Sequence, residues 1–396
     1  MKAKALWLVL VAQFCSAFAD NALLFAAIMM VKHEAFPIWS IPLLQSFFTG
    51  AYILLAPFVG AIADAYPKGR VMLLANGLKL AGGISMALGL NPFIAYGLVG
   101  AGAAAYSPAK YGILPEILPL ERLVRGNGWL EASTIVAILL GAVVGGFLSD
   151  KDLNLAFAVV TAFYVTAAII NFFIPRLPPA QPSTLKPLVL LKRFIVDVKV
   201  LWRDRAARLS LIGTSAFWGA GATLRFMLVA WVPVALGIMG NEMPSKLNGV
   251  VAIGVVIGAA VAGKFITLTA STRVLPAGGL IGVAIIAFAM SGNVWTAIVF
   301  CTVVGALGGF FVVPLNALLQ ERGHESVGSG SAIAVQNLME NVAMFVLIAA
   351  WTGLSASGTP VVSAAIVFGS VFGLFMFWFW RSNRAVKIQD GPPDRN

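Results

Sequence analysis

Long apolar runs recur along this 396-residue chain, and they constrain its fold more than any other feature. Each run is near or beyond 18 residues with few charges, which is the length that a helix needs to cross a bilayer. The chain is 60% hydrophobic and 11% charged, far from the balance of a soluble domain. The sequence therefore predicts an all-α membrane protein with twelve transmembrane helices. The predicted spans are residues 5–31, 42–63, 71–90, 94–118, 127–149, 153–174, 209–237, 247–269, 274–291, 293–319, 326–352 and 359–380.

The net charge of +11 does not indicate a nucleic-acid partner, because the basic residues are distributed as the predicted membrane topology requires. With the N-terminus placed inside, 21 of the 27 Lys and Arg residues fall in inner segments, 3 in outer loops and 3 within the membrane. The positive-inside rule then predicts that both termini are cytoplasmic. The basic inner surface also suits contact with anionic membrane lipids.

A central linker divides the predicted spans into two groups of six. It starts with a proline-rich stretch at residues 175–182 and continues as a basic amphipathic segment from Leu185 to Arg208, which is typical of a helix on a membrane surface. We expect a six-helix bundle at 1–175, the linker at 176–208, a second bundle at 209–381 and a cytoplasmic tail at 382–396. The halves read as repeats, because the fourth and tenth spans carry Pro108 and Pro314 at similar positions and each is followed by a charged loop with glycines.

The loop between the second and third spans carries a known type of signature. It contains Gly60, Asp64, Gly69 and Arg70, and it resembles the loop 2–3 motif of the major facilitator superfamily, with one extra residue before Gly69 and Ala65 in place of a basic residue. The resemblance implies two parallel six-helix repeats with substrate held between them near the midplane of the membrane. It also makes Asp64 and Arg70 candidates for a cytoplasmic gate.

Two charged residues lie in the apolar first and seventh spans. A charge at the centre of a bilayer costs at least ~2.5–3.5 kcal/mol, so Asp20 is expected to face a cavity or a partner. When the repeats are aligned at Phe14 and Phe217, Arg225 falls within two residues of the position equivalent to Asp20. We therefore expect Asp20 and Arg225 at similar depth on opposite walls of the cavity. They could bind substrate, or they could form only a latch with each other.

Three further intramembrane charges have candidate roles. Lys110 follows Pro108 near the inner end of the fourth span, and we expect it to pair with Glu116 or Asp64 at the gate. Glu131 lies one turn into the fifth span and is a further gate candidate. Lys79, in the third span, is expected to extend to the inner interface.

Four strings resemble the bacterial lysophospholipid transporters, a family within the same superfamily. They are AAYSPAKYGIL at 104–114, TSAFWGAG at 214–221, GGFFVVPLNALLQ at 308–320 and AVQNL at 334–338. The resemblance implies movement of lysophosphatidylethanolamine and related lysolipids from the outer to the inner leaflet of the bacterial inner membrane by facilitated diffusion. It further implies reacylation by a lysophospholipid acyltransferase on the cytoplasmic side, and no cofactor.

The residue types suit such a substrate. Arg225 is a natural ligand for the phosphate, and Asp20, with Glu340 second, for the ammonium group. Neutral hydrogen bonds to the glycerol are expected from Asn21, Gln336, Asn337 and Asn341. Acyl-chain contacts are expected from Phe217, Trp218, Phe226 and Met227.

Two other classes of function compete with lysolipid transport. Asp20, Glu131 and Glu340 could carry protons in a proton-coupled exporter of drugs or lipophilic compounds, although an intramembrane Arg suits a phosphate better than a lipophilic cation. An enzyme is not expected, because the two histidines, His33 and His324, lie in predicted loops and no nucleotide loop or metal-ligand cluster is present in the sequence. Cys15 and Cys301 lie in apolar runs, so a disulfide framework is not expected.

Overall fold

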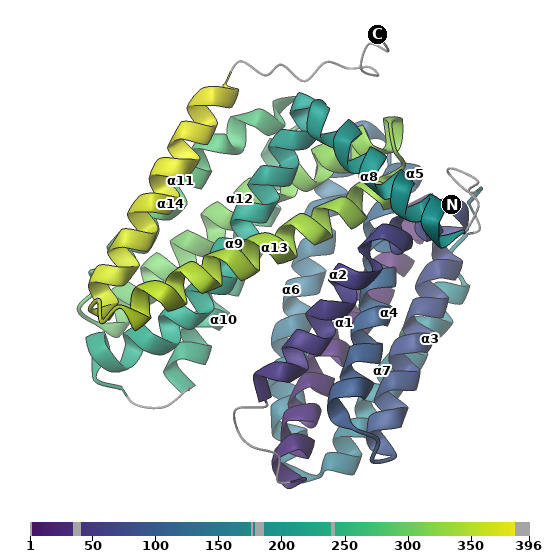
Figure 1. Cartoon of the computed structure of the whole chain (residues 1–396), viewed down its shortest axis with the longest axis horizontal. Coiled ribbons are helices and arrows are strands. Elements are labelled where there is room, and N and C mark those ends of the chain that lie inside the picture. The colour runs from purple at the N-terminus through teal and green to yellow at the C-terminus, as the bar shows by residue number, and fades with distance from the viewer. Residues whose placement is uncertain (1, 35–40, 176, 179–185, 239–241, 385–396) are drawn as a thin grey trace. The chain divides into compact units, whose positions relative to one another are not determined.

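The fold is all-α in the part of the chain that the structure describes. The computed structural model describes residues 2–34, 41–175, 177–178, 186–238 and 242–384, and no β-strand occurs among them. The chain separates into two compact units, which are coloured mainly purple to blue and teal to yellow in Figure 1. The first unit comprises 1–119, 133–201 and 320–338, and the second comprises 120–132, 202–319 and 339–396. Each unit thus contains a short segment from the other half of the chain.

The first unit is built on five long helices that lie side by side, together with most of α6 (Figure 1). Its helices are α1 (Lys2–His33), α2 (Ile41–Ala65), α3 (Lys68–Ala87), α4 (Pro92–Gly112), the short α5 (Leu114–Ile117), α6 (Leu120–Lys151), α7 (Leu153–Phe172) and α8 (Pro187–Arg203). Within this unit α4 packs against both α2 and α3, and α7 packs against both α1 and α3.

The second unit contains the remaining helices. They are α9 (Arg205–Leu236), α10 (Glu242–Phe265), the 3-10 helix η2 (Leu268–Val274), α11 (Leu275–Ala289), α12 (Val294–Glu325), α13 (Ser329–Ala356) and α14 (Val361–Asn383). The last turn of α12 and the first turns of α13 belong to the first unit. Within the second unit, α11 packs along α14.

Each of the twelve predicted spans coincides with a helical segment. Within the described residues, ten of these segments are long and apolar enough to cross a membrane. The other two predicted spans correspond to α3 and α4. These helices are less apolar because α3 carries Lys68, Arg70, Asn76 and Lys79, and α4 is rich in glycine and alanine.

The predicted linker helix is present as α8. Its buried stripe consists of Leu190, Phe194, Asp197 and Leu201, while several of its apolar side chains, such as Leu188 and Trp202, are exposed beside its basic residues. This pattern suits a helix on a membrane surface. Residues 179–185 of the predicted linker and 385–396 of the predicted tail lie outside the described residues.

The core of the first unit forms where small residues allow helices to approach closely. A Cβ atom on Gly141 or Gly145 of α6 would overlap the backbone of α1 at Phe18 or Ala22. The Phe18 ring stacks on Phe163 of α7, with ring centroids 4.1 Å apart. These two glycines therefore serve helix packing, and the contacts fix the part of α1 that carries Asp20.

Candidate functional site

A buried ion pair lies inside the first unit, where α1, α3 and α7 meet. The Lys79 ammonium is 2.7 Å from Oδ2 of Asp20, and the Tyr164 hydroxyl donates to Oδ1 of Asp20 at 2.7 Å. The Lys79 side chain is 3% exposed and that of Asp20 is 17% exposed. The carboxylate therefore has a cation and a hydrogen-bond donor within its own unit, and it retains a small accessible surface.

Other polar groups extend this cluster around Lys79. Its ammonium donates to the Ser16 hydroxyl at 3.0 Å, and Ser16 donates to Oδ1 of Asn76 at 2.7 Å. The same ammonium lies 4.8 Å from the centroid of the Tyr106 ring. A buried charge is tolerated when it is paired and hydrogen-bonded in this way. We call Asp20, Lys79, Tyr164, Ser16 and Asn76 the Asp20 cluster.

The expectation that Lys79 extends to the inner interface is wrong. Lys79 lies three turns inside α3, and its side chain is buried against α1. The reason is electrostatic, because the nearby Asp20 carboxylate stabilises the charged ammonium inside the bundle. Arg225 lies in the second unit, so its predicted match in depth with Asp20 stays a prediction.

A second charged network joins the C-terminal end of α2, the N-terminal end of α3 and the short helix α5. Lys68 lies 3.3 Å from Oδ1 of Asp64 and 2.5 Å from Oε1 of Glu116. Asp64 also accepts hydrogen bonds of 2.9 Å from the backbone N–H groups of Gly330 and Ser331, at the N-terminus of α13. The positive end of a helix dipole stabilises a carboxylate in this position. We call Asp64, Lys68, Glu116 and the N-terminus of α13 the Asp64 network.

The structure adds a member to the predicted gate. Lys68, which sequence reasoning missed, is the cation placed against both Asp64 and Glu116. Arg70 is exposed, two residues further along α3, and the Lys110 ammonium lies 4.1 Å from the centroid of the Tyr111 ring. The closeness of Lys68 and Asp64 in the sequence was a usable signal, because only the short turn at Tyr66 and Pro67 separates the end of α2 from the start of α3.

The predicted gate residue Glu131 lies in the second unit. Its side chain is buried and its Oε1 accepts a hydrogen bond of 3.2 Å from Asn316 of α12. The α6 backbone approaches α10 closely here, because a Cβ on Gly128 would lie 3.0 Å from the Ala259 carbonyl oxygen. Glu131 and Arg225 thus share a unit, while Asp64 and Asp20 share the other.

Arg225 and the predicted acyl-chain residues all lie on α9. Arg225 and Phe226 are exposed, while Met227 is fully buried. Phe217 and Trp218 are half-buried, and their rings meet edge to face with centroids 5.4 Å apart. The burial of Met227 makes it a packing residue of the second unit, whereas the other three side chains have accessible surface.

The remaining predicted binding residues occupy α1 and α13. Asn21 is half-buried and donates to the Ala17 carbonyl oxygen at 2.8 Å. Asn337 donates to the Ser107 hydroxyl of α4 at 3.0 Å. Gln336 and Glu340 are buried, at 4% and 8% exposure. These four residues are thus hydrogen-bonded or buried within the protein, and their contact with substrate stays a prediction.

No metal site is found within the described residues. No group of three or more His, Cys, Asp or Glu side chains there could hold an ion. Cys15 and Cys301 are free and buried. The charged side chains of the Asp20 cluster and the Asp64 network can form ion pairs and hydrogen bonds.

Comparison with known proteins identifies the fold first. The model of the Major Facilitator Superfamily matches residues 9–348. Among solved structures, the human organic anion transporter MFSD10 aligns with a TM-score of 0.79 at 14% identity, covering 96% of this chain and 99% of that one. The transporter FucP in its outward conformation aligns with a TM-score of 0.75 at 13% identity, covering 95% and 98%. The chain belongs to the major facilitator superfamily.

Sequence relatives narrow this class. The Lysophospholipid transporter LplT of Serratia proteamaculans is 54% identical over 380 residues, covering 96% of both chains. The protein of that name from Escherichia coli O6:K15:H31 is 52% identical over 381 residues, again covering 96% of both. That from Yersinia enterocolitica is 55% identical over 356 residues, covering 90% of this chain and 88% of the relative. Within the superfamily, the chain groups with these relatives, as its four sequence strings predicted.

Proposed function

We propose that this protein is a lysophospholipid transporter that moves lysophosphatidylethanolamine and related lysolipids from the outer to the inner leaflet of the bacterial inner membrane. The observation that carries the proposal is identity above 50% with relatives of that name over nearly the whole chain. Both termini would be cytoplasmic, as the charge distribution predicts. A cytoplasmic-side acyltransferase would consume the product.

The headgroup of the substrate would be held by charges on two helices. Arg225 is an exposed guanidinium on a membrane helix, and a phosphate is the ligand that its paired donors fit best. The ammonium group would bind Asp20. Each oxygen of Asp20 accepts one hydrogen bond, from Lys79 or Tyr164, and the side chain keeps 17% exposure, so a further donor has room.

The rest of the lysolipid would contact neutral groups. Asn21, Gln336 and Asn337 would hydrogen-bond the glycerol, with Glu340 as a second partner for the ammonium. Phe217, Trp218 and Phe226 would line the acyl chain. The Asp64 network and Glu131, together with Arg70 and Lys110, would form the gate whose opening and closing gives alternating access.

Uptake of labelled lysolipid tests the proposal. Spheroplasts that express the protein in a host without its own lysolipid transporter should accumulate labelled lysophosphatidylethanolamine, and a protonophore should leave the initial rate unchanged. Spheroplasts with the empty vector give the background. Uptake at the background rate would refute lysolipid transport, and a rate that collapses with the protonophore would favour the proton-coupled alternative.

A further inference from the structure

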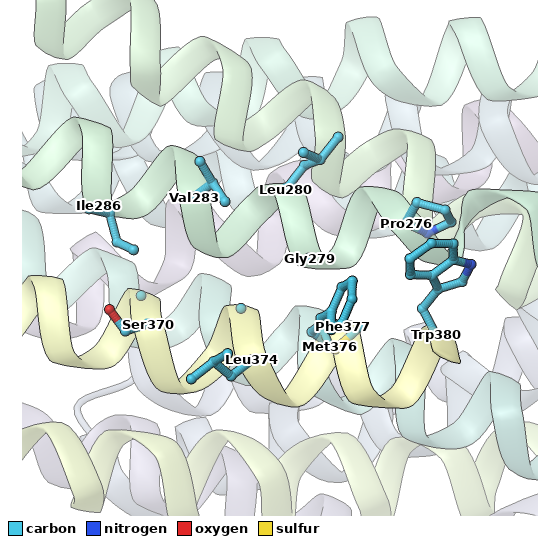
Figure 2. Close-up of a pocket in the computed structure, with 12 residues that line it drawn as sticks. Pro276, Gly279, Leu280, Val283, Ile286, Ser370, Leu374, Met376, Phe377 and Trp380 are labelled. Carbon is cyan, nitrogen blue, oxygen red and sulfur yellow. The ribbon is translucent and has the colours of Figure 1, made fainter. Parts of the chain in front are cut away.

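A long apolar groove runs along the surface of the second unit, between α11 and α14. It has a volume of about 610 Å³. Figure 2 shows side chains from both helices along its length, with Ile286 and Ser370 toward one end and Pro276 and Trp380 toward the other. None of its lining residues belongs to the proposed substrate site or gate, so the groove needs a separate explanation.

Glycines create the groove. A Cβ atom on Gly282 would overlap the Gly373 backbone, so the two helices are in close contact at this level. At Gly279 the nearest atoms to an added Cβ, the Gly373 carbonyl oxygen and the Phe377 backbone nitrogen, are both 3.9 Å away, so the two helices are further apart here and a side chain fits without overlap. Larger side chains on either side, such as Leu280 and Phe377, rise as walls above this small-residue floor.

The groove faces hydrocarbon. Leu280, Val283 and Leu374 along it are 52%, 61% and 69% exposed, on helices that are apolar enough to cross a membrane. From Pro276 to Ile286 a helix rises roughly 15 Å. This is about half of the ~30 Å hydrocarbon core, which is the depth of one leaflet. The dimensions therefore suit one acyl chain of a lipid in a single leaflet.

Positive charge gathers at one end of the groove. Arg273 lies just before α11, and Arg381 and Arg384 lie at the end of α14, so all three are next to the end that Pro276 and Trp380 mark in Figure 2. All three arginines are exposed. The positive-inside rule assigns this end to the cytoplasmic side, and Trp is favoured at the level of lipid headgroups.

We propose that this groove binds an anionic diacyl phospholipid of the cytoplasmic leaflet. One acyl chain would lie over Gly279 between the walls, and the phosphate would pair with Arg273 and Arg381 through charge-assisted hydrogen bonds. The lipid would be a resident of the second unit, distinct from the transported lysolipid. It would hold α11 and α14 together beyond the point where their glycines touch.

Native mass spectrometry of the purified protein titrated with phosphatidylglycerol tests the proposal, with phosphatidylcholine of the same chains as the neutral probe. Gly279→Leu fills the groove, and Gly353→Leu is its matched control, because Gly353 on α13 has no atom within 4 Å of an added Cβ and lies outside the groove. We expect phosphatidylglycerol to bind the wild type and Gly353→Leu at least fivefold more tightly than Gly279→Leu. The double variant Arg273→Gln/Arg381→Gln, which changes only exposed side chains, should bind both lipids equally.

Three results would overturn the proposal. Equal binding to Gly279→Leu and Gly353→Leu would place the lipid elsewhere. An equal affinity of the wild type for both lipids would show that the groove does not select an anionic headgroup. Displacement of phosphatidylglycerol by equimolar lysophosphatidylethanolamine would make the groove a path for substrate rather than the site of a resident lipid. Should Gly279→Leu fail to fold, the arginine variant decides the outcome.

Discussion

Asp20 is central to the proposed headgroup site. The structure places it against Lys79 and Tyr164, so its charge is balanced inside the first unit before any substrate arrives. Pairing of this kind preserves a charge within a membrane helix bundle. It also means that a substrate ammonium would share Asp20 with Lys79 rather than meet a bare carboxylate.

Removing Lys79 should destabilise the protein. In Lys79→Met, Asp20 keeps its charge in a mostly buried site with only Tyr164 as partner, and losing one member of a buried pair costs about 3 kcal/mol. Thermal unfolding of the detergent-purified variant should show a clear fall in Tm. The double variant Asp20→Asn/Lys79→Met removes both charges and should recover most of the loss; a double variant as unstable as the single one would contradict the pairing.

Sequence reasoning identified Asp20 as a residue that needs a partner but did not find Lys79. The reason is that the pattern of apolar residues shows which positions are in a helix, whereas it does not show which faces of α1 and α3 meet. Tyr164 was missed for the same reason, since nothing near it in the sequence distinguishes it from an ordinary core aromatic. Lys68 was missed although it lies only four residues after Asp64 in the sequence.

At the scale of elements, the contact between α2 and the start of α13 rests on a glycine. A Cβ on Gly60 would lie 2.7 Å from the Ser331 Cα and 2.9 Å from the Gly330 carbonyl oxygen. This close approach lets Asp64, one turn further on, reach the first N–H groups of α13. The element contact and the Asp64 network are therefore one structural feature.

A large side chain at Gly60 should separate these helices. Gly60→Leu is expected to lower stability by about 1–3 kcal/mol or more, the range for overpacking. Gly50→Leu is the matched control on the same helix, because no atom lies within 4 Å of an added Cβ there. The Tm of both purified variants measures the difference, and equal Tm values would contradict the tight contact at Gly60.

The α8 helix should respond to pH through Asp197. Burial raises the pKa of this carboxyl to about 6, while Arg193 and a hydrogen bond from Ser331 oppose the rise and the Asp64 charge adds to it. Because the folded pKa is raised, the protonated form stabilises the docked helix at low pH, and this contribution is lost as the pH rises through about 6. Ser331 also links α8 to the Asp64 network, since its N–H donates to Asp64.

Asp197→Asn should remove this pH dependence. The variant is expected to gain up to ~3 kcal/mol of stability over the wild type at pH 7.5 and little at pH 4, because the neutral amide resembles the protonated acid. Comparing the Tm of the two proteins at both pH values measures the effect. A difference between them that does not change with pH would contradict it.

At the scale of the whole molecule, much of the fold could be predicted from sequence. The twelve helical segments and the linker helix follow from hydropathy and charge alone, because the bilayer dictates helix length. The cytoplasmic placement of both termini stays a prediction of the positive-inside rule. The α11–α14 groove could not be predicted in this way, since it depends on how Gly279, Gly282 and Gly373 meet across two helices. Loop 2–3 identified the superfamily, whereas the longer strings around Lys110 and Asn316 identified the closer relatives.

The environment of Asp20 bears on whether Asp20 and Arg225 act as a latch or as substrate ligands. In the swapped variant Asp20→Arg/Arg225→Asp, the new arginine would face the Lys79 ammonium in a buried site, which is unfavourable for like charges. We expect this variant to lose lysolipid uptake while it still inserts into the membrane. Uptake at the wild-type rate would show that only the mutual pairing of the two residues matters.

The most direct test of the central claim is the initial rate of lysophosphatidylethanolamine uptake by Arg225→Ala, compared with the wild type at equal amounts of protein in the membrane. A charged hydrogen bond to the phosphate contributes about 1.5–3 kcal/mol, so the account predicts that uptake falls at least tenfold. A rate close to that of the wild type would contradict the assignment of Arg225 as the phosphate ligand.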